Sequence, residues 1–216
     1  MSKIISIGQA IDLVKDGDML LIGGFLGVGT PEPLIDELVK SGKKDLTLVC
    51  NDTSFVDRGV GKLVVTKQFK KIIASHIGTN KETGRQMTEG ETEVVLVPQG
   101  TLAEQVRAGA YGLGGILTPT GIGTEVQKGK EVIELNGKEY LLEEAIKGNV
   151  SLLQADTVDK YGNMQFHGST QNFNVPMAGA SDITIVYAKK LVDCIDPDLV
   201  KVPGVLVDYI IDGGQE

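Results

Sequence analysis

The sequence predicts an α/β protein of one domain, residues 1–216, with an open, mainly parallel twisted sheet, flanking helices and a small antiparallel hairpin flap. Three observations support this prediction. Apolar runs of strand length alternate with segments of helical periodicity along the chain. The runs are almost continuously apolar, as expected of strands covered on both faces. Hydrophobic residues make up 41% of the chain, which supplies a sizeable core.

The first predicted element is a helix that begins after Ser6. Ser6 and Gln9 have the spacing of a capping box before the amphipathic segment GQAIDLVKDG, and Gly17 is suited to end the helix. The run MLLIGG that follows has the length and composition of a strand covered on both faces.

A second helix is predicted for the segment PEPLIDELVKSG. Leu34, Ile35 and Leu38 have the spacing of one apolar helix face. Thr30 is a suitable N-cap and Pro31 a suitable first helical residue. We therefore expect a strand, a glycine-rich loop and a helix in direct succession.

The remaining strands are predicted from seven further apolar runs, several of them separated by segments of helix length. The runs are LTLVCN, KIIASH, EVVLVP, GGILTP, SLLQAD, ITIVYA and GVLVDYII. One segment has another character: KEVIELNGKEYLLEE alternates apolar and polar residues around Asn136-Gly137, the strongest short-range hairpin signal. We expect a small antiparallel flap there.

Charge and composition exclude several function classes. The formal net charge of −8 draws the protein neither to nucleic acid nor to an anionic membrane. No apolar run approaches the ~18 residues of a membrane span, and the N-terminus lacks a signal-peptide core, so we expect a soluble cytoplasmic protein. Cys50 and Cys194 are expected to be buried, and they and the two histidines, His76 and His167, do not have the spacing of a metal site.

The stretch LLIGGFLGVGTPEPLIDEL, residues 20–38, is the first candidate site. Ligands of open α/β sheets bind beyond the carboxyl ends of the strands, where loops lead into helix N-termini. Four glycines let the backbone approach a ligand, and the helix that starts at Pro31 would present free N–H groups to an anion. The alternative is a tight turn that packs helix on strand. A P-loop is excluded, because no Gly-Lys-Ser/Thr follows.

A dinucleotide fingerprint is the other motif to weigh in this stretch. Asp52 lies about twenty residues beyond Gly29, roughly where a ribose-binding acid would lie. The G-x-G-x-x-G spacing fails, however, because Glu32 occupies the place of the last glycine.

A second candidate site follows the strand in EVVLVPQGTLAEQVRAG, residues 93–109. Pro98 ends the strand, Thr101 and Glu104 have capping-box spacing, and Gln99 is left at the corner between strand and helix. A neutral amide beside a helix N-terminus suits an oxyanion site, where donors stabilise charge that develops on a carbonyl oxygen. The alternative is that Gln99 only caps the corner.

Asn51 offers a second neutral amide on the same edge of the sheet, because it ends the strand LTLVCN. An Asx turn is the alternative role for Asn51. The later glycine-rich loop LTPTGIGTEVQ would add a third element to the rim of this edge.

At these motifs the sequence resembles a known family. The stretch DGDMLLIGGFLGVGTP, residues 16–31, resembles the signature of the family I coenzyme A transferases. VCND, PQGTLAEQVRAG, TPTGIGT, EEAIKG, YGN, NFNVPMA and VPGVLVDYII resemble the α subunit of that family, in order, across nearly the whole chain. Within the family the chain is most similar to α subunits that act on acetate, butyrate or acetoacetate.

The resemblance implies a mechanism and a partner. Family I enzymes move CoA between carboxylates by ping-pong chemistry through an acyl-glutamyl anhydride and a glutamyl-CoA thioester. The glutamate belongs to the β half, and no glutamate of this chain has the glycine-rich setting expected of that nucleophile. The resemblance therefore implies a β subunit as partner in an α2β2 assembly, with acyl-CoA and short-chain carboxylates as substrates. It implies no metal and no tightly bound cofactor, with coenzyme A as a cosubstrate.

The resemblance also assigns roles to residues. Gln99 would be an oxyanion donor, and Asn51 would position the acyl or glutamyl carbonyl. Asp52 is a departure, since some relatives have a second asparagine there. The loop that faces CoA or the active-site cleft would consist of Gly24, Phe25, Leu26, Gly27, Val28, Gly29 and Thr30.

Other functions remain open at this point. Within the family, the alternative is the α subunit of a 3-oxoacid CoA-transferase of the succinyl-CoA type. From other classes, the alternatives are a Rossmann-like NAD-dependent enzyme and a noncatalytic sugar-phosphate or anion-binding module.

Overall fold

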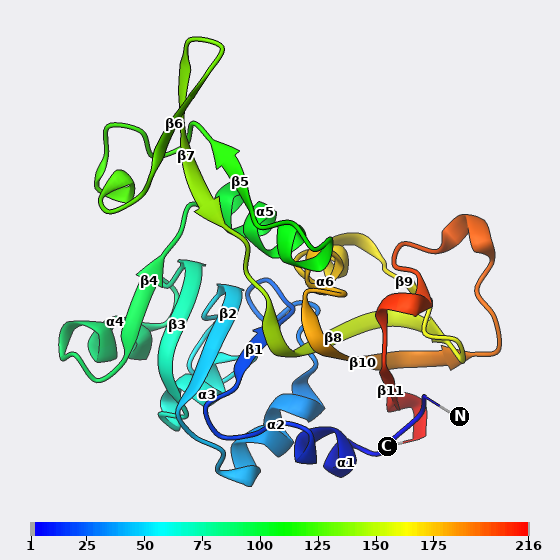
Figure 1. The fold of residues 1–216 in the computed structure, drawn as a ribbon. Coiled ribbons are helices and arrows are strands. Elements are labelled where there is room, and N and C mark those ends of the chain that lie inside the picture. The colour runs from blue at the N-terminus through cyan, green and yellow to red at the C-terminus, as the bar shows by residue number, and fades with distance from the viewer. Residues whose placement is uncertain (1–2, 216) are drawn as a thin grey trace.

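The computed structural model describes residues 3–215 and is built on one large sheet and one small one (Figure 1). The large sheet has the strand order β11-β10-β8-β1-β2-β3-β4, and all these neighbours pair in parallel. A short strand, β9 (Met164–Gln165), pairs antiparallel with β8. The seven parallel strands are β1 (Met19–Ile22), β2 (Leu46–Asp52), β3 (Phe69–His76), β4 (Glu93–Leu96), β8 (Gly148–Asp159), β10 (Ser181–Val192) and β11 (Tyr209–Asp212).

Helices cover both faces of this sheet, which confirms the predicted class. On one face lie α1 (Ile7–Asp12), α2 (Glu32–Ser41) and α3 (Gly61–Val65), and on the other α5 (Gln99–Ala110) and α6 (Asn174–Met177). Successive strand residues point to opposite faces, so Leu20 and Ile22 pack with the first group of helices and Leu21 packs with the second. The continuous apolar runs of the sequence result from this double coverage.

The order of the strands creates a switch point beside β1. The chain runs outward from β1 through β2 and β3 to the edge strand β4, and then returns to place β8 on the other side of β1. Loops that follow β1 and β8 therefore meet at the carboxyl edge, together with the ends of β2 and β3. Open α/β sheets bind their ligands at such a place.

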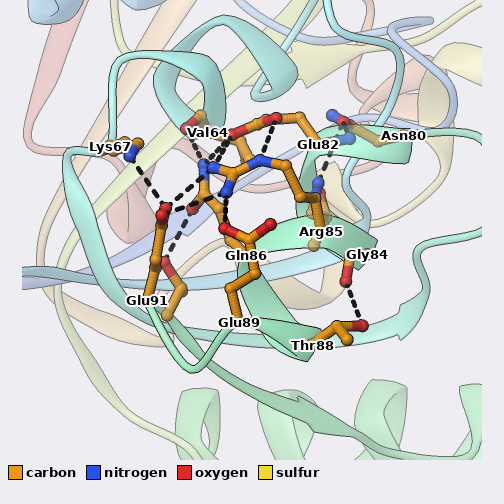
Figure 2. A network of polar contacts seen from close by, with 12 residues as sticks. Val64, Lys67, Asn80, Glu82, Gly84, Arg85, Gln86, Thr88, Glu89 and Glu91 are labelled. Atoms are coloured by element: carbon orange, nitrogen blue, oxygen red, sulfur yellow. Dashed lines mark hydrogen bonds and ion pairs between the residues drawn. The ribbon is translucent and has the colours of Figure 1, made fainter.

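The remaining helix, α4 (Lys81–Thr88), is held at the β4 side of the sheet by an ion-pair network (Figure 2). Arg85 pairs with Glu82 at 2.6 Å, with Glu91 at 2.8 Å and with Glu89. Lys67 also pairs with Glu91, at 2.9 Å. The network ties α4 to the segments that precede β3 and β4.

The small sheet is the predicted flap, with one strand more than expected. It has the order β5-β7-β6, from β5 (Gly115–Thr118), β6 (Val132–Leu135) and β7 (Lys138–Glu144), all antiparallel. Asn136 and Gly137 form its turn with φ of 55° and 73°, as the Asn-Gly signal predicts. The run GGILTP was wrongly expected in the main sheet: it forms strand β5 of the flap and pairs antiparallel with β7.

Short 3-10 helices complete the described part of the chain: η1 (Glu125–Gln127), η2 (Gly168–Gln171), η3 (Pro197–Leu199), η4 (Gly204–Leu206) and η5 (Gly213–Gln215).

The helix ends match the predictions only in part. The capping box of Ser6 and Gln9 is present, but α1 ends at Asp12, well before Gly17. Helix α2 has Pro31, not Thr30, at its N-cap. The predicted capping box at the start of α5 is wrong: α5 begins directly after the strand-ending Pro98, so that Thr101 already lies inside the first turn and cannot be its N-cap.

The two cysteines differ in environment. Cys50 is buried, and desolvation together with the nearby Asp52 charge raises the pKa of its thiol well above its ordinary value. Cys194 is exposed, which corrects the expectation that both are buried. Among residues 3–215, no helix has the length and apolarity to cross a membrane, and no cluster of three His, Cys, Asp or Glu side chains is arranged to hold a metal ion.

Candidate active site

Two neutral amides meet at the carboxyl edge of the sheet. Asn51, near the end of β2, is 1% exposed, and Gln99 is the exposed first residue of α5. Gln99 Nε2 donates a hydrogen bond to Asn51 Oδ1 at 2.5 Å. On the neighbouring β3, Ser75 Oγ lies 2.6 Å from Gln99 Oε1 and 2.7 Å from the backbone oxygen of Asn51. The structure thus brings together the two amides that the sequence indicated separately.

Asp52 connects this amide pair to the glycine-rich loop. Its buried carboxylate accepts hydrogen bonds from Asn51 Nδ2 at 2.7 Å, from the backbone N–H of Ser54 at 2.8 Å and from that of Leu26 at 3.1 Å. Through this one side chain, both candidate regions of the sequence become parts of a single hydrogen-bonded site.

Two asparagines hold the glycine-rich loop from the other side. Asn172 accepts from the N–H of Gly24 at 3.2 Å and donates to the carbonyl oxygen of Val28 at 2.9 Å. Asn174, fully buried at the start of α6, donates to the carbonyl oxygen of Gly29 at 2.9 Å. Both asparagines lie in the motif NFNVPMA, where two asparagines beside an aromatic residue were the available sequence signal, and their role was not predicted.

These contacts explain the glycines of the loop. A Cβ at Gly23 would lie 1.9 Å from Asn174 Oδ1, and a Cβ at Gly24 would lie 2.0 Å from the hydroxyl oxygen of Thr30. Gly27 has φ of +85°, in the left-handed region that favours glycine. At Gly23 and Gly24 the close neighbours of the backbone are side chains of the protein itself, and the close approach to a ligand stays a prediction.

Only the tip of the loop is open to a ligand. Gly24, Gly29 and Thr30 are buried, whereas Phe25 and Val28 are 46% and 43% exposed. Phe25 and Val28 exchange backbone hydrogen bonds of 2.9 and 2.8 Å across a tight turn. Of the proposed ligand-facing residues, 25–28 are those that a ligand or a partner can reach.

The N-terminus of α2 does not have the free N–H groups expected for an anion. Pro31 and Pro33 carry none, and the N–H of Glu32 donates to the carbonyl oxygen of Thr30 at 2.9 Å. The carboxylate of Glu32 accepts from the N–H of Gly59 at 2.6 Å. The start of α2 therefore offers fewer free N–H groups than the sequence suggested, and an anion site there stays a prediction.

A second turn lies beside the loop tip and resembles it. Phe55 and Arg58 are bridged as Phe25 and Val28 are, and a Cβ at Gly27 would lie 2.7 Å from Arg58 Cδ. The guanidinium of Arg58 stacks over the ring of Phe55 at 5.4 Å from its centroid. We call the exposed apolar side chains of the two turns the apolar tip; they are Phe25, Val28, Phe55 and Val56.

An open cavity of about 410 Å³ lies between the first turns of α5 and strand β5, and Gly100, which follows Gln99 in the sequence, lines it. One wall contains Gly100, Thr101 and Glu104, and the opposite wall contains Ile116 and Leu117. The cavity therefore has an apolar side and a side formed by the start of a helix.

The fold and the site define a class: an α/β domain with a parallel sheet that presents uncharged amide groups, and not a phosphate-binding loop, at its carboxyl edge. Residues 4–213 match the coenzyme A transferase family, and the chain belongs to that family. The family assignment stated for the sequence motifs is thereby confirmed.

The relatives of this chain carry related names. The acetate CoA-transferase subunit alpha of Escherichia coli K12 is 48% identical over 212 residues, which cover 97% of this chain and 96% of the relative. The acetoacetyl-CoA:acetate/butyrate CoA transferase alpha subunit of Clostridium acetobutylicum is also 48% identical over 212 residues, with 97% of each chain covered.

A solved structure shares the fold. An acyl-CoA transferase of Escherichia coli O157:H7, in a thioester complex with CoA, superposes with a TM-score of 0.87 and 23% identity. The match covers all of this chain and 48% of that one, so the present chain spans about half of the length of that enzyme.

The alternatives from other classes are not favoured. Family membership argues against both the NAD-dependent enzyme and the noncatalytic anion-binding module. The geometry agrees for NAD, because the Asp52 carboxylate is 5% exposed and already accepts hydrogen bonds from Asn51, Ser54 and Leu26. It is not available to a ribose hydroxyl.

Proposed function

We propose that this chain is the α subunit of a CoA-transferase that moves CoA between an acyl-CoA and a short-chain carboxylate, namely acetate, butyrate or acetoacetate. The names of the two bacterial relatives support this substrate class. The single observation that carries the proposal is the hydrogen-bonded pair of Gln99 and Asn51 at the open edge of the sheet. We place the reaction in the cytoplasm, with CoA as a cosubstrate and not as a tightly bound cofactor.

The amide pair supplies donors for an oxyanion. A side-chain amide nitrogen carries two hydrogens, and Gln99 Nε2 uses one of them on Asn51. The second hydrogen of the exposed Gln99 is available to a carbonyl oxygen that gains negative charge as a carboxylate attacks a thioester. Asn51 holds Gln99 in place and positions the acyl or glutamyl carbonyl.

The nucleophilic glutamate is proposed to come from a partner β subunit. Two carboxylates near the edge are engaged within the protein: Glu32 pairs with Lys62 at 2.7 Å, and Asp52 is buried in the hydrogen-bond network. The proposal agrees with the word alpha in the names of both relatives and with the half-length match to the acyl-CoA transferase structure. An α2β2 assembly, with the apolar tip facing the partner, is part of this proposal.

The open cavity beside Gln99 is proposed to receive the acyl group. Ile116 and Leu117 give it an apolar wall for a short aliphatic chain. Among the described residues that line it, none is Lys or Arg, and Glu104 contributes a carboxylate. A second carboxylate, as in succinate, would find no cation in the lining and would lie near Glu104, whose ion pair with Arg107 at 3.4 Å is exposed, so we propose that this cavity favours monocarboxylates over the succinyl-CoA type of substrate.

Reconstitution tests the proposal. The purified chain alone should not exchange CoA between acetyl-CoA and butyrate, and activity should appear when the β partner is added. Borohydride, which reduces a glutamyl-CoA thioester, should then place its label on the partner chain. Robust transfer by this chain alone, free of partner, or label on this chain would contradict the proposal.

A further inference from the structure

A directed chain of hydrogen bonds runs through the amide pair. Gln99 Nε2 donates to Asn51 Oδ1 at 2.5 Å, and Asn51 Nδ2 donates to Asp52 Oδ2 at 2.7 Å. The Ser75 hydroxyl lies 2.6 Å from Gln99 Oε1 and 2.7 Å from the Asn51 carbonyl oxygen, and its single hydrogen serves these two acceptors. Both amide groups donate in the direction of the Asp52 carboxylate.

The chemistry of a carboxylate explains this direction. An ionised carboxylate only accepts hydrogen bonds, so Asn51 must turn its NH2 group toward Asp52 and its oxygen toward Gln99. Gln99 must then turn its own NH2 group toward Asn51 and its oxygen toward Ser75, whose hydroxyl can donate. One acceptor-only group thus fixes the orientation of both amides.

We infer that Asp52 is a positioning residue of the transferase site, which acts through Asn51 to keep an N–H hydrogen of Gln99 directed at the reacting carbonyl. The inference rests on the proposed function. If the orientation reversed, Gln99 would present the lone pairs of its oxygen to the developing oxyanion, and stabilisation would become repulsion.

The two carboxylate oxygens of Asp52 accept hydrogen bonds from different groups, and this difference makes the inference testable. Oδ1 accepts from the backbone N–H groups of Ser54 at 2.8 Å and Leu26 at 3.2 Å. Oδ2 faces the Asn51 amide, and Leu26 also lies 3.1 Å from it. In an Asp52→Asn variant, the remaining oxygen can keep both backbone hydrogen bonds, while an NH2 group would face Asn51 Nδ2. Two NH2 groups cannot pair with each other, so the side-chain amides of Asn51 and Gln99 would both turn over. The glycine-rich loop would keep its hydrogen bond from Leu26 to residue 52.

The test is Asp52→Asn in the reconstituted complex with the β partner. We expect kcat to fall by at least about tenfold, up to the roughly 10²–10³-fold loss of a removed oxyanion donor, with KM within about twofold of wild type. In a Gln99→Ala background, Asp52→Asn should lower kcat no further, because its effect on kcat passes through Gln99. Asp57→Asn, a substitution of an exposed carboxylate on the neighbouring turn, is the matched control for the change in charge.

A second measurement is independent of activity. A neutron crystal structure of the Asp52→Asn chain locates the amide hydrogens, and we expect Gln99 Nε2 to face Ser75 Oγ in it. A variant that keeps the wild-type amide orientation, wild-type kcat, or a loss that adds fully to that of Gln99→Ala would overturn the inference. An inactive wild-type complex, by contrast, would count against the proposed function and leave the neutron result to decide the role of Asp52.

Discussion

Gln99 Nε2 lies 2.5 Å from Asn51 Oδ1, although the two residues are 48 positions apart in the chain. The contact joins the first turn of α5 to the end of β2 across the intervening strand β3. Each amide follows an apolar strand, and parallel strands bring their carboxyl ends to one edge. The site therefore follows from the order of the strands, and its details depend on the groups that orient each side chain.

Asn172 is predicted to control the order of the glycine-rich loop. Asn172→Ala removes the acceptor for Gly24 N–H and the donor to the Val28 carbonyl, together with hydrogen bonds to Ser169 and from Asn174, and we expect a net loss of about 1–3 kcal/mol of stability. Amide hydrogen exchange of residues 23–29 should accelerate, and KM for acyl-CoA should rise.

The matched control for this prediction is Asn149→Ala, at the opposite end of β1. Asn149 accepts one hydrogen bond from the N–H of Met19 at 2.8 Å. This variant should leave exchange in the glycine-rich loop unchanged. Unchanged exchange at 23–29 in Asn172→Ala would show that the loop does not depend on this side chain.

Gly27→Val is predicted to lower activity more than its effect on folding explains. Valine at φ of +85° costs about 1–2 kcal/mol, and its Cβ also displaces the side chain of Arg58 at the loop tip. Gly42→Val is the control, since Gly42 has φ of +65° and no neighbour within 4 Å, at the end of α2. Both complexes should melt at similarly lowered temperatures, and only Gly27→Val should lose turnover. Equal turnover in the two variants would reduce the loop to a packing turn.

The network of Figure 2 is predicted to contribute to acid stability. The pKa of Glu82 and the pKa of Glu91 are each lowered from 4.5 to about 2, and hydrogen bonds from Arg85 are the largest cause. Because the folded-state pKa values are depressed, this stabilisation is fully present above about pH 4.5 and is lost as the pH falls through about 2. Arg85→Gln should therefore lower the melting temperature at pH 7 and converge with wild type near pH 2.

Lys40→Gln, which breaks the exposed ion pair with Glu37, is the control for the acid series. The difference in melting temperature between this variant and the wild type should stay constant from pH 7 to about pH 2, because solvent screens such a pair. A constant offset between Arg85→Gln and wild type from pH 7 to about pH 2 would mean that Glu82 and Glu91 do not titrate as described.

The strands, the two faces and the carboxyl-edge site could be predicted from the sequence, because double coverage produces apolar runs and strand ends carry the polar residues. Other features could not. GGILTP has the composition of a main-sheet strand, and only tertiary packing assigns it to the flap. The Thr101 capping box failed because α5 starts three residues earlier than predicted, which moves the N-cap from Thr101 to Pro98. The orientation of Gln99 depends on Asp52, which acts through Asn51. These residues belong to α5 and β2, which no local sequence pattern connects.

The most direct test of the central claim is the turnover of Gln99→Ala in the reconstituted complex. Loss of an oxyanion donor costs on the order of 10²–10³ in rate, roughly 2.7–4 kcal/mol, and appears in the transition state more than in substrate binding. We predict a fall of kcat of that size with little change in KM and in melting temperature. A Gln99→Ala complex that melts early but turns over normally would contradict the account, because Gln99 would then only cap the corner between β4 and α5.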